Sequence, residues 1–340
     1  MKNIVTIGGG IAGIEVASLL SGLGYEVTLM EKAPELGGKI QNYNVLFPNF
    51  RHASEIKEYL FNKCKNNGFD IHTNTEIVDI AKKNGKFLIR AKNNKTFRSD
   101  AVIITTGFEF FDARKKEEYG YKIYDNVITS VDLEEKFKNA KKILTAKGKI
   151  PERIAFIHCV GSRDEKSGNH YCSKVCCITG VKQAIELREM LPDSEIFCFY
   201  IDLRMYAQSY EELYRSAQEN YSIQFIRGRL SEVSGNFDES LLIKAEDTLS
   251  GRPLKMNVDL LVLLVGMEPG SGTTSLGKSC KLNFDSSGFL KAKDVHTKRN
   301  FSSKEGIFIA GTCSCPMSVN DTLENARSAA IEIHNYFKNK

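Results

Sequence analysis

Short apolar runs and amphipathic stretches alternate along this chain. The first run, Asn3–Ile7, is followed by a stretch with Ile14, Ala17 and Leu20 on one face, and then by a second run over Glu26–Met30. Apolar residues three to four positions apart indicate a helix, whereas short continuous runs indicate buried strands. The N-terminal part of the chain is therefore predicted to fold as strand, helix, strand.

The same alternation continues toward the C-terminus. We predict further helices over 57–67, 175–190, 210–219 and 321–336, and further strands within 71–92 and over 101–107, 154–158, 196–201, 223–226, 230–233, 241–245 and 258–265. Strands that alternate with helices favour an α/β fold with parallel sheets. We expect two Rossmann-like domains with the second inserted in the first: residues 1–112 and 257–340, a connector over 113–150, and the second domain over 151–256.

A glycine-rich turn separates the first strand from the first helix. It reads Gly8-Gly9-Gly10-Ile11-Ala12-Gly13, and Glu31 stands at the end of the second strand. In a dinucleotide-binding site, such glycines permit a tight turn, close approach to a pyrophosphate and close helix–strand packing, while the acid bonds a ribose hydroxyl. A glycine turn without a ligand is the alternative, but the strand context and the position of the acid favour dinucleotide binding.

Three later segments resemble flavoproteins of the thioredoxin and glutathione reductase kind. They are Glu31-Lys32 followed by Gly37-Gly38-Lys39, the strand end Thr105-Thr106-Gly107, and the run Gly306–Thr312, in which Thr312 replaces the usual aspartate. The resemblance implies FAD as the dinucleotide. It adds FAD-binding roles for Lys32, Gly38, Lys39, Thr106, Gly107, Gly311, Thr312 and Asp321, the last as the N-cap of the closing helix.

Composition and charge narrow the class of protein. The chain has 340 residues, 42% of them hydrophobic and 26% charged, and its net charge of +5 is spread along the sequence. This pattern predicts no nucleic-acid partner. No apolar run approaches the roughly 20 residues of a membrane span, so the chain is not expected to cross a membrane. Its N-terminus enters a strand directly, from which we expect a cytoplasmic location.

Four of the nine cysteines gather in one segment. Cys159, Cys172, Cys176 and Cys177 have the spacing C-x12-C-x3-C-C. A disulfide between the adjacent pair would be strained, because neighbouring Cα atoms lie about 3.8 Å apart and a relaxed disulfide needs about 4.4–6.8 Å. By ligand type, four thiolates suit zinc or an iron–sulfur cluster. The adjacent pair favours the larger cluster.

This cysteine segment stands where a second dinucleotide fingerprint would begin. After the strand 154–158, the chain continues Cys159-Val160-Gly161-Ser162-Arg163, and only one of the three fingerprint glycines can be matched. We therefore predict weak or absent NAD(P)H binding.

Several uncommon strings resemble the A subunit of heterodisulfide reductase and its relatives. They include Lys115–Tyr121, Asn126–Ser130, Cys159–Asp164, Tyr171–Cys177 and Phe225–Arg229. The resemblance implies a thioredoxin-reductase-like core that binds FAD, a [4Fe–4S] cluster on the four cysteines, and Lys182 as the residue that reaches toward the flavin. It also implies other subunits or an electron-carrier protein as partners, and a homodimer. The chain lacks the ferredoxin motifs of the longer members.

Two alternatives remain at this point. The first is a self-sufficient NAD(P)H-dependent disulfide or sulfur reductase with Cys313 and Cys315 as its dithiol. The second is a flavin-binding scaffold with a structural zinc ion. The partner proteins, the direction of electron flow and the terminal substrate are not determined by the sequence.

Overall fold

The structure is a computed structural model that describes residues 1–66 and 68–339. The chain forms two compact units. Unit 1 comprises residues 1–41, 53–109 and 268–340, and unit 2 comprises residues 42–52 and 110–267. The segment 42–52, which the sequence places within the first domain, thus packs with unit 2. The chain passes between the units at each end of the segment 42–52, at β10 (Phe108–Phe110) and at β19 (Met267–Pro269).

A five-stranded parallel sheet with the order β20-β9-β1-β2-β5 forms the centre of unit 1. Its strands are β1 (Asn3–Ile7), β2 (Glu26–Met30), β5 (Asp70–His72), β9 (Ala101–Ile104) and β20 (Ile307–Ile309). Both faces of the sheet carry apolar side chains because each face is covered by another layer of the unit.

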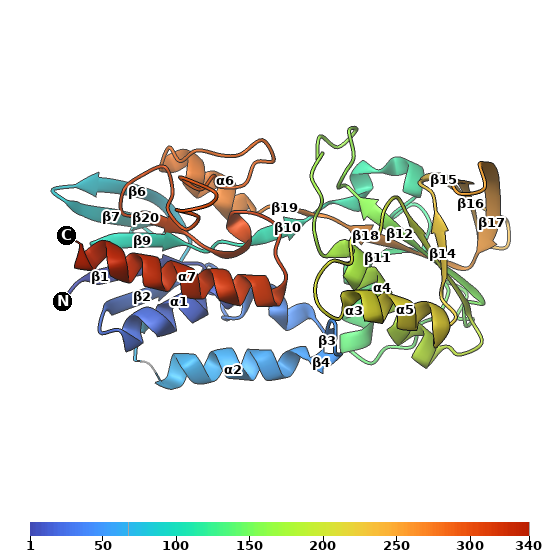
Figure 1. The fold of residues 1–340 in the computed structure, drawn as a ribbon, viewed down its shortest axis with the longest axis horizontal. Coiled ribbons are helices and arrows are strands. Elements are labelled where there is room, and N and C mark those ends of the chain that lie inside the picture. The colour runs from blue at the N-terminus through green and yellow to red at the C-terminus, as the bar shows by residue number, and fades with distance from the viewer. Residues whose placement is uncertain (67, 340) are drawn as a thin grey trace. The chain divides into compact units, whose positions relative to one another are not determined.

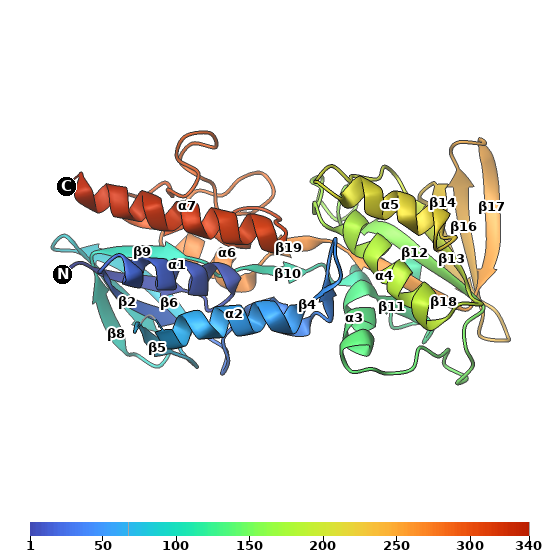
Figure 2. The ribbon, with the colours of Figure 1, turned by 60° about the horizontal axis from the view of Figure 1, so that its bottom comes forward.

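Helices cover one face of this sheet and a smaller sheet covers the other. The helices α1 (Ile11–Gly22) and α7 (Val319–Lys338) run side by side, with α2 (Ala53–Asn66) next to α1 (Figures 1 and 2). They enclose a core that includes Leu20 and Ile333. The other layer consists of β6 (Ile77–Lys83), β7 (Lys86–Ala91) and β8 (Thr96–Ser99), with α6 (Ser271–Ser279) beside β6.

Unit 2 repeats this plan with its own five-stranded parallel sheet, in the order β11-β18-β12-β13-β14. Its strands are β11 (Val127–Thr129), β12 (Arg153–Val160), β13 (Glu195–Tyr200), β14 (Gln224–Arg227) and β18 (Leu260–Val265). A short hairpin of β3 (Val45–Leu46) and β4 (Arg51–His52) also belongs to this unit.

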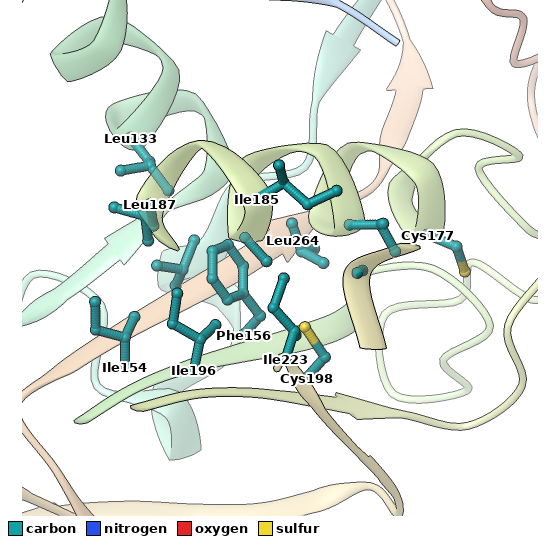
Figure 3. Packing of buried hydrophobic residues seen from close by; sticks show 14 of the residues in the cluster. Leu133, Ile154, Phe156, Cys177, Ile185, Leu187, Ile196, Cys198, Ile223 and Leu264 are labelled. Atoms are coloured by element: carbon teal, nitrogen blue, oxygen red, sulfur yellow. The ribbon is translucent and has the colours of Figure 1, made fainter. Parts of the chain in front are cut away.

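Three helices cover one face of this second sheet: α3 (Ser130–Lys138), α4 (Cys176–Met190) and α5 (Tyr210–Glu219). Figure 3 shows Phe156 of β12 packed beneath Ile185 of α4. The other face is covered by an antiparallel sheet of β15 (Leu230–Gly235), β16 (Leu241–Asp247) and β17 (Arg252–Val258).

The predicted fold class is confirmed, with local differences. Helix α2 begins at Ala53, four residues before the predicted start, and the predicted last residue, Asn67, lies outside the described residues. Helix α4 begins at Cys176, one residue after the predicted start, and Cys172 lies in the segment before it. None of the helices among the described residues combines the length and the apolar character that crossing a membrane requires.

Candidate functional site

The glycine turn of unit 1 packs tightly on one side and is open on the other. Gly8 has φ +111°, and a Cβ there would lie 2.4 Å from the Thr105 carbonyl oxygen. A Cβ at Gly13 would lie 1.8 Å from the Gly8 carbonyl oxygen, whereas a Cβ at Gly10 would meet nothing within 4 Å. The first and third glycines therefore allow close packing, and the middle glycine faces open space beside the start of α1.

The carboxylate of Glu31 is oriented by the backbone around this turn. One oxygen accepts a hydrogen bond from the N–H of Gly9 at 2.6 Å, and the other accepts from the N–H of Ala33 at 2.7 Å. Each carboxylate oxygen has two lone pairs, so acceptor capacity remains for a hydroxyl ligand. The predicted role of Glu31 toward a ribose hydroxyl stays a prediction.

The paired glycines Gly37 and Gly38 lie against the same turn. The N–H of Gly37 donates to the Gly9 carbonyl oxygen at 2.7 Å, and a Cβ at Gly38 would lie 3.1 Å from the Cα of Gly10. Next in the chain, burial lowers the pKa of Lys39, whose Nζ lies 5.2 Å from the centre of the Phe108 ring. Lys32 is exposed.

Two further predicted segments meet at the ends of β9 and β20. A Cβ at Gly107 would lie 3.8 Å from the Thr312 hydroxyl oxygen. Gly311 has φ +74°, and a Cβ there would lie 2.8 Å from the Cβ of Ala12 in α1. Thr106 also contacts Thr273, with 2.7 Å between the two hydroxyl oxygens. The predicted FAD residues from four separate segments of the sequence are thus neighbours.

The start of α7 corrects one prediction. Ser318, not Asp321, is the N-cap residue: its hydroxyl accepts from the N–H of Asp321, and the Asp321 carboxylate accepts from the N–H of Ser318 at 2.9 Å. Asp321 therefore completes a capping box in the first turn of the helix. The helix begins at Val319, two residues before the predicted start at Asp321, because Ser318 can cap it.

Sequence reasoning missed two polar residues that shape this site. The amide oxygen of Asn325 accepts from the N–H of Gly311 at 2.8 Å, and the hydroxyl of Thr105 donates to the carbonyl oxygens of Ile7 and Gly8, each at 2.9 Å. Asn325 is buried on the helix face that packs on the sheet. A polar residue among apolar positions of a helix was the available signal.

In unit 2, the strand β12 bulges at His158 and Cys159. Ile157 pairs with Leu263 and Val160 pairs with Val265, so two residues of β12 face one residue of β18. Cys159 also has φ +61°, which non-glycine residues seldom adopt. Bulges redirect side chains at the ends of strands. This one places the first cysteine of the segment near the start of α4.

The other three cysteines gather at the same end of α4. The thiol of Cys176 contacts those of Cys159, Cys172 and Cys177. These contacts raise the pKa of Cys176. Hydrogen bonds with Cys176 are the largest cause of the opposite shift in two of its neighbours: the pKa of Cys177 falls to about 4 and that of Cys172 to about 6. No cluster of three or more His, Cys, Asp or Glu among the described residues has the arrangement of a metal site.

One main-chain N–H group and two guanidinium groups act on these sulfur atoms. The N–H of Lys174 lies 3.3 Å from the Cys172 sulfur. The charge of Arg204 acts on Cys172, and that of Arg163 acts on Cys159. A helix N-terminus and nearby guanidinium groups stabilise thiolates, which are the metal-binding form of cysteine.

The loop between Cys159 and Cys172 is fixed by close packing. Gly161 has φ +69°, and a Cβ there would lie 2.0 Å from the Phe111 ring. A Cβ at Gly266 would lie 2.8 Å from the Ser173 hydroxyl, which also accepts from the N–H of Met267. The Phe111 ring thus fills the space beside the one glycine of this segment that matches the fingerprint. The expected weak or absent NAD(P)H binding stays a prediction.

Lys182 lies inside unit 2, in a network with two glutamates. Its Nζ is 2.8 Å from Glu134 and 3.0 Å from Glu186, and it donates to the Val45 carbonyl oxygen at 3.1 Å. Burial raises the pKa of Glu186; the charge of Lys182 opposes this shift and that of Glu134 adds to it. The expected role of Lys182 toward a flavin stays a prediction.

A small pocket of about 40 Å³ lies within unit 2 beside Cys176. Glu134, Thr179 and Gln183 supply polar groups to its lining, and Tyr43 is one of its aromatic residues. The four-cysteine group therefore adjoins a cavity.

Cys313 and Cys315 do not have the features of a reactive dithiol. Cys313 is fully buried, its Sγ lies 3.2 Å from the carbonyl oxygens of Ile104 and Ala310, and burial raises its pKa to about 12. Cys315 is half-buried, 3.6 Å from Arg299. A thiol that is held protonated is a poor nucleophile, which argues against the dithiol alternative.

Comparison with known proteins identifies the class. Residues 1–139 match the family described as pyridine nucleotide-disulphide oxidoreductase. The thioredoxin reductase of T. acidophilum has the same fold, with a TM-score of 0.68 and 18% identity, over 98% of this chain and 99% of that one. The likeness to thioredoxin reductase shows the predicted fold class, and the family match covers the N-terminal part of the chain.

Within that class, the chain is related to the A subunits of heterodisulfide reductases. The iron-sulfur A subunit of the CoB--CoM heterodisulfide reductase of Methanocaldococcus jannaschii is 31% identical over 418 aligned positions, which cover 98% of this chain and 64% of the relative. The A subunit of the H(2):CoB-CoM heterodisulfide,ferredoxin reductase of Methanothermobacter thermautotrophicus is 37% identical over 67% of this chain and 36% of the relative. The predicted resemblance is confirmed. The chain spans less than two thirds of both relatives.

Proposed function

We propose that this chain is an FAD- and [4Fe–4S]-dependent electron-transfer subunit of a heterodisulfide-reductase-like complex. It would pass electrons to or from partner subunits or an electron-carrier protein, in sulfur, disulfide or related anaerobic energy metabolism. The gathering of four cysteine thiols at the start of α4, where a second dinucleotide fingerprint would lie, carries this proposal.

The residues of unit 1 fit FAD. Gly10 leaves open space at the start of α1, and the Glu31 carboxylate is oriented by two backbone N–H groups. We assign the pyrophosphate to the turn with Gly8, Gly10 and Gly13, and a ribose hydroxyl to Glu31. Thr312 offers a hydroxyl where related flavoproteins have an aspartate.

The four thiols fit a metal centre by their donor chemistry. Cys176 contacts the other three, and two guanidinium groups that favour thiolates act on them. When bound, a flavin exchanges electrons singly or in pairs and an iron–sulfur cluster exchanges them singly, which suits a protein that joins the two kinds of chemistry. Cys159, Cys172, Cys176 and Cys177 would hold the iron, and the Lys182 charge would stabilise reduced flavin.

The partners follow from the relatives, whose names describe subunits of larger reductases. We infer that this chain also acts with other subunits. The homodimer and the cytoplasmic location stay predictions from the sequence.

Anaerobic purification with iron, sulfide and flavin analysis tests the proposal. We expect about four irons, four sulfides and one FAD per chain, with an EPR signal after reduction. Zinc without sulfide would instead support the scaffold alternative, and rapid flavin reduction by NADH or NADPH would support the self-sufficient reductase.

Matched cysteine variants locate the centre. Cys176→Ala should lose iron and sulfide while it retains FAD. Cys198→Ala is the control because Cys198 is also buried in unit 2, in β13, outside the four-cysteine group. If both variants retain their iron, the assignment of the ligands is wrong.

A further inference from the structure

His158, in the bulge of β12, is a buried polar side chain without a hydrogen-bond partner. The residue is 5% exposed, and neither ring nitrogen has a hydrogen-bond partner among the residues that the structure describes. A buried polar group without a partner loses its hydrogen bonds to water and gains none in return, so such groups in native proteins call for an explanation.

The surroundings of the ring restrict what that partner is. A Cβ at Gly180 would lie 3.0 Å from the Cε1 atom and 3.1 Å from the Nε2 atom of His158, so glycine at this position of α4 makes room for the imidazole. The same Cβ would lie 2.4 Å from Leu264, which closes the site with apolar atoms. Cys177 lies one helical turn before Gly180 in α4, and His158 acts on its thiol, although neither ring nitrogen forms a well-aligned hydrogen bond.

We propose that His158 is a positioning residue whose ring N–H donates a hydrogen bond to the Cys177 thiolate when that sulfur is a cluster ligand. The inference rests on the proposed function. A neutral imidazole has one N–H donor, so no change of protonation is required. Hydrogen bonds to ligand sulfurs stabilise the added negative charge of a reduced cluster and raise its reduction potential. Burial strengthens this effect.

Substitutions of similar size test the role of the N–H group. His158→Met removes the donor and His158→Gln keeps one in its amide group. The measurements are iron and sulfide content and the midpoint potential of the cluster, obtained by EPR-monitored redox titration of the anaerobic protein. We expect both variants to retain the cluster, the Met variant to have a lower potential than the wild type, and the Gln variant to lie nearer the wild type.

Two more variants test the position of the ring and the specificity of the effect. Gly180→Ala keeps the histidine in the sequence but adds a methyl group that displaces its ring. It should therefore lower the midpoint potential of the cluster, as His158→Met does. His170→Met changes an exposed histidine of the same segment and should leave the potential unchanged.

The outcomes separate the two proposals. A wild-type protein without iron and sulfide would overturn the proposed function. If the wild type holds the cluster and the His158→Met and Gly180→Ala variants have the same midpoint potential as the wild type, only the role of His158 is overturned.

Discussion

The main-chain N–H of Gly9 donates a 2.6 Å hydrogen bond to the carboxylate of Glu31. This bond connects the glycine turn after β1 to the end of β2, and with it the two parts of the candidate FAD site. The Glu31 carboxylate accepts hydrogen bonds from the N–H groups of both Gly9 and Ala33 and so fixes the local backbone. The remaining lone pairs of its oxygens can accept a hydrogen bond from a ligand.

Substitution of Glu31 should therefore weaken FAD binding. We expect Glu31→Ala to raise the dissociation constant for FAD about 10- to 100-fold, which corresponds to the loss of one or two charged hydrogen bonds. Flavin fluorescence titration measures this change. Glu35→Ala, at an exposed position of the same loop, should bind like the wild type. Equal affinities of the two variants would contradict the assignment.

Two glycines of the same turn should respond differently to alanine. Gly13→Ala places a Cβ 1.8 Å from a backbone oxygen, so we expect a loss of stability of about 1–3 kcal/mol or more from overpacking. Gly10→Ala meets no neighbouring atom, so the apo-protein should keep its stability while its FAD affinity falls. Thermal unfolding of the apo-proteins and FAD titration separate the two effects. A Gly10→Ala variant with normal FAD affinity would show that the pyrophosphate lies elsewhere.

Stability should depend on Asp164 in acid. Burial acts to raise its pKa, but the Lys116 amine at 2.9 Å and the Arg229 guanidinium at 3.2 Å outweigh burial and hold the pKa below its ordinary value of 3.8. A carboxyl whose pKa is lower in the folded state stabilises the fold above its unfolded pKa, and this contribution is lost as the pH falls through the folded pKa.

We therefore expect Asp164→Asn to lower the free energy of unfolding at pH 7 by about 1.5–3 kcal/mol, the contribution of a hydrogen bond to a charged group. Lys116 loses one of its two carboxylate partners and keeps Glu118 at 2.8 Å. The difference from the wild type should shrink as the pH falls below 3.8. Urea denaturation across this pH range measures it. Asp193→Asn, at an exposed position, is the control. A difference that does not change with pH would exclude the ion pair as its cause.

Removal of the Lys182 charge should destabilise unit 2. Lys182→Met leaves the Glu134 and Glu186 carboxylates buried without their shared cation, which we expect to cost about 3–5 kcal/mol. Adding Glu186→Gln should recover part of that loss because it removes one of the two negative charges. Guanidinium denaturation of the two single variants and the double variant gives the coupling. Additive effects would mean that the pair does not interact.

Cys313 should be unreactive in the native protein. With a pKa raised to about 12 by burial, almost none of its thiol is ionised at about pH 8. In a time course with N-ethylmaleimide followed by mass spectrometry, we expect Cys315 to react well before Cys313. Comparable rates would restore the dithiol alternative.

The sequence was sufficient wherever the chemistry is local. The turn from Gly8 to Gly13 and the position of Glu31 depend on backbone conformations within a few residues, so spacing alone predicted their arrangement. The cysteine spacing likewise predicted a common location for four thiols. Both α/β units followed from alternating apolar runs, because burial of a two-sided sheet imposes that pattern on any sequence.

Tertiary structure decided which distant groups meet. The bond between Asn325 and Gly311, the partners of Lys182, and the Phe111 ring beside Gly161 join segments far apart in the sequence. The cap at Ser318 and the burial of Cys313 depend in the same way on their surroundings. Such contacts depend on how the layers pack and exclude water, and on which buried polar groups still need a hydrogen-bond partner. The pattern of apolar and polar residues along a sequence carries little information about either.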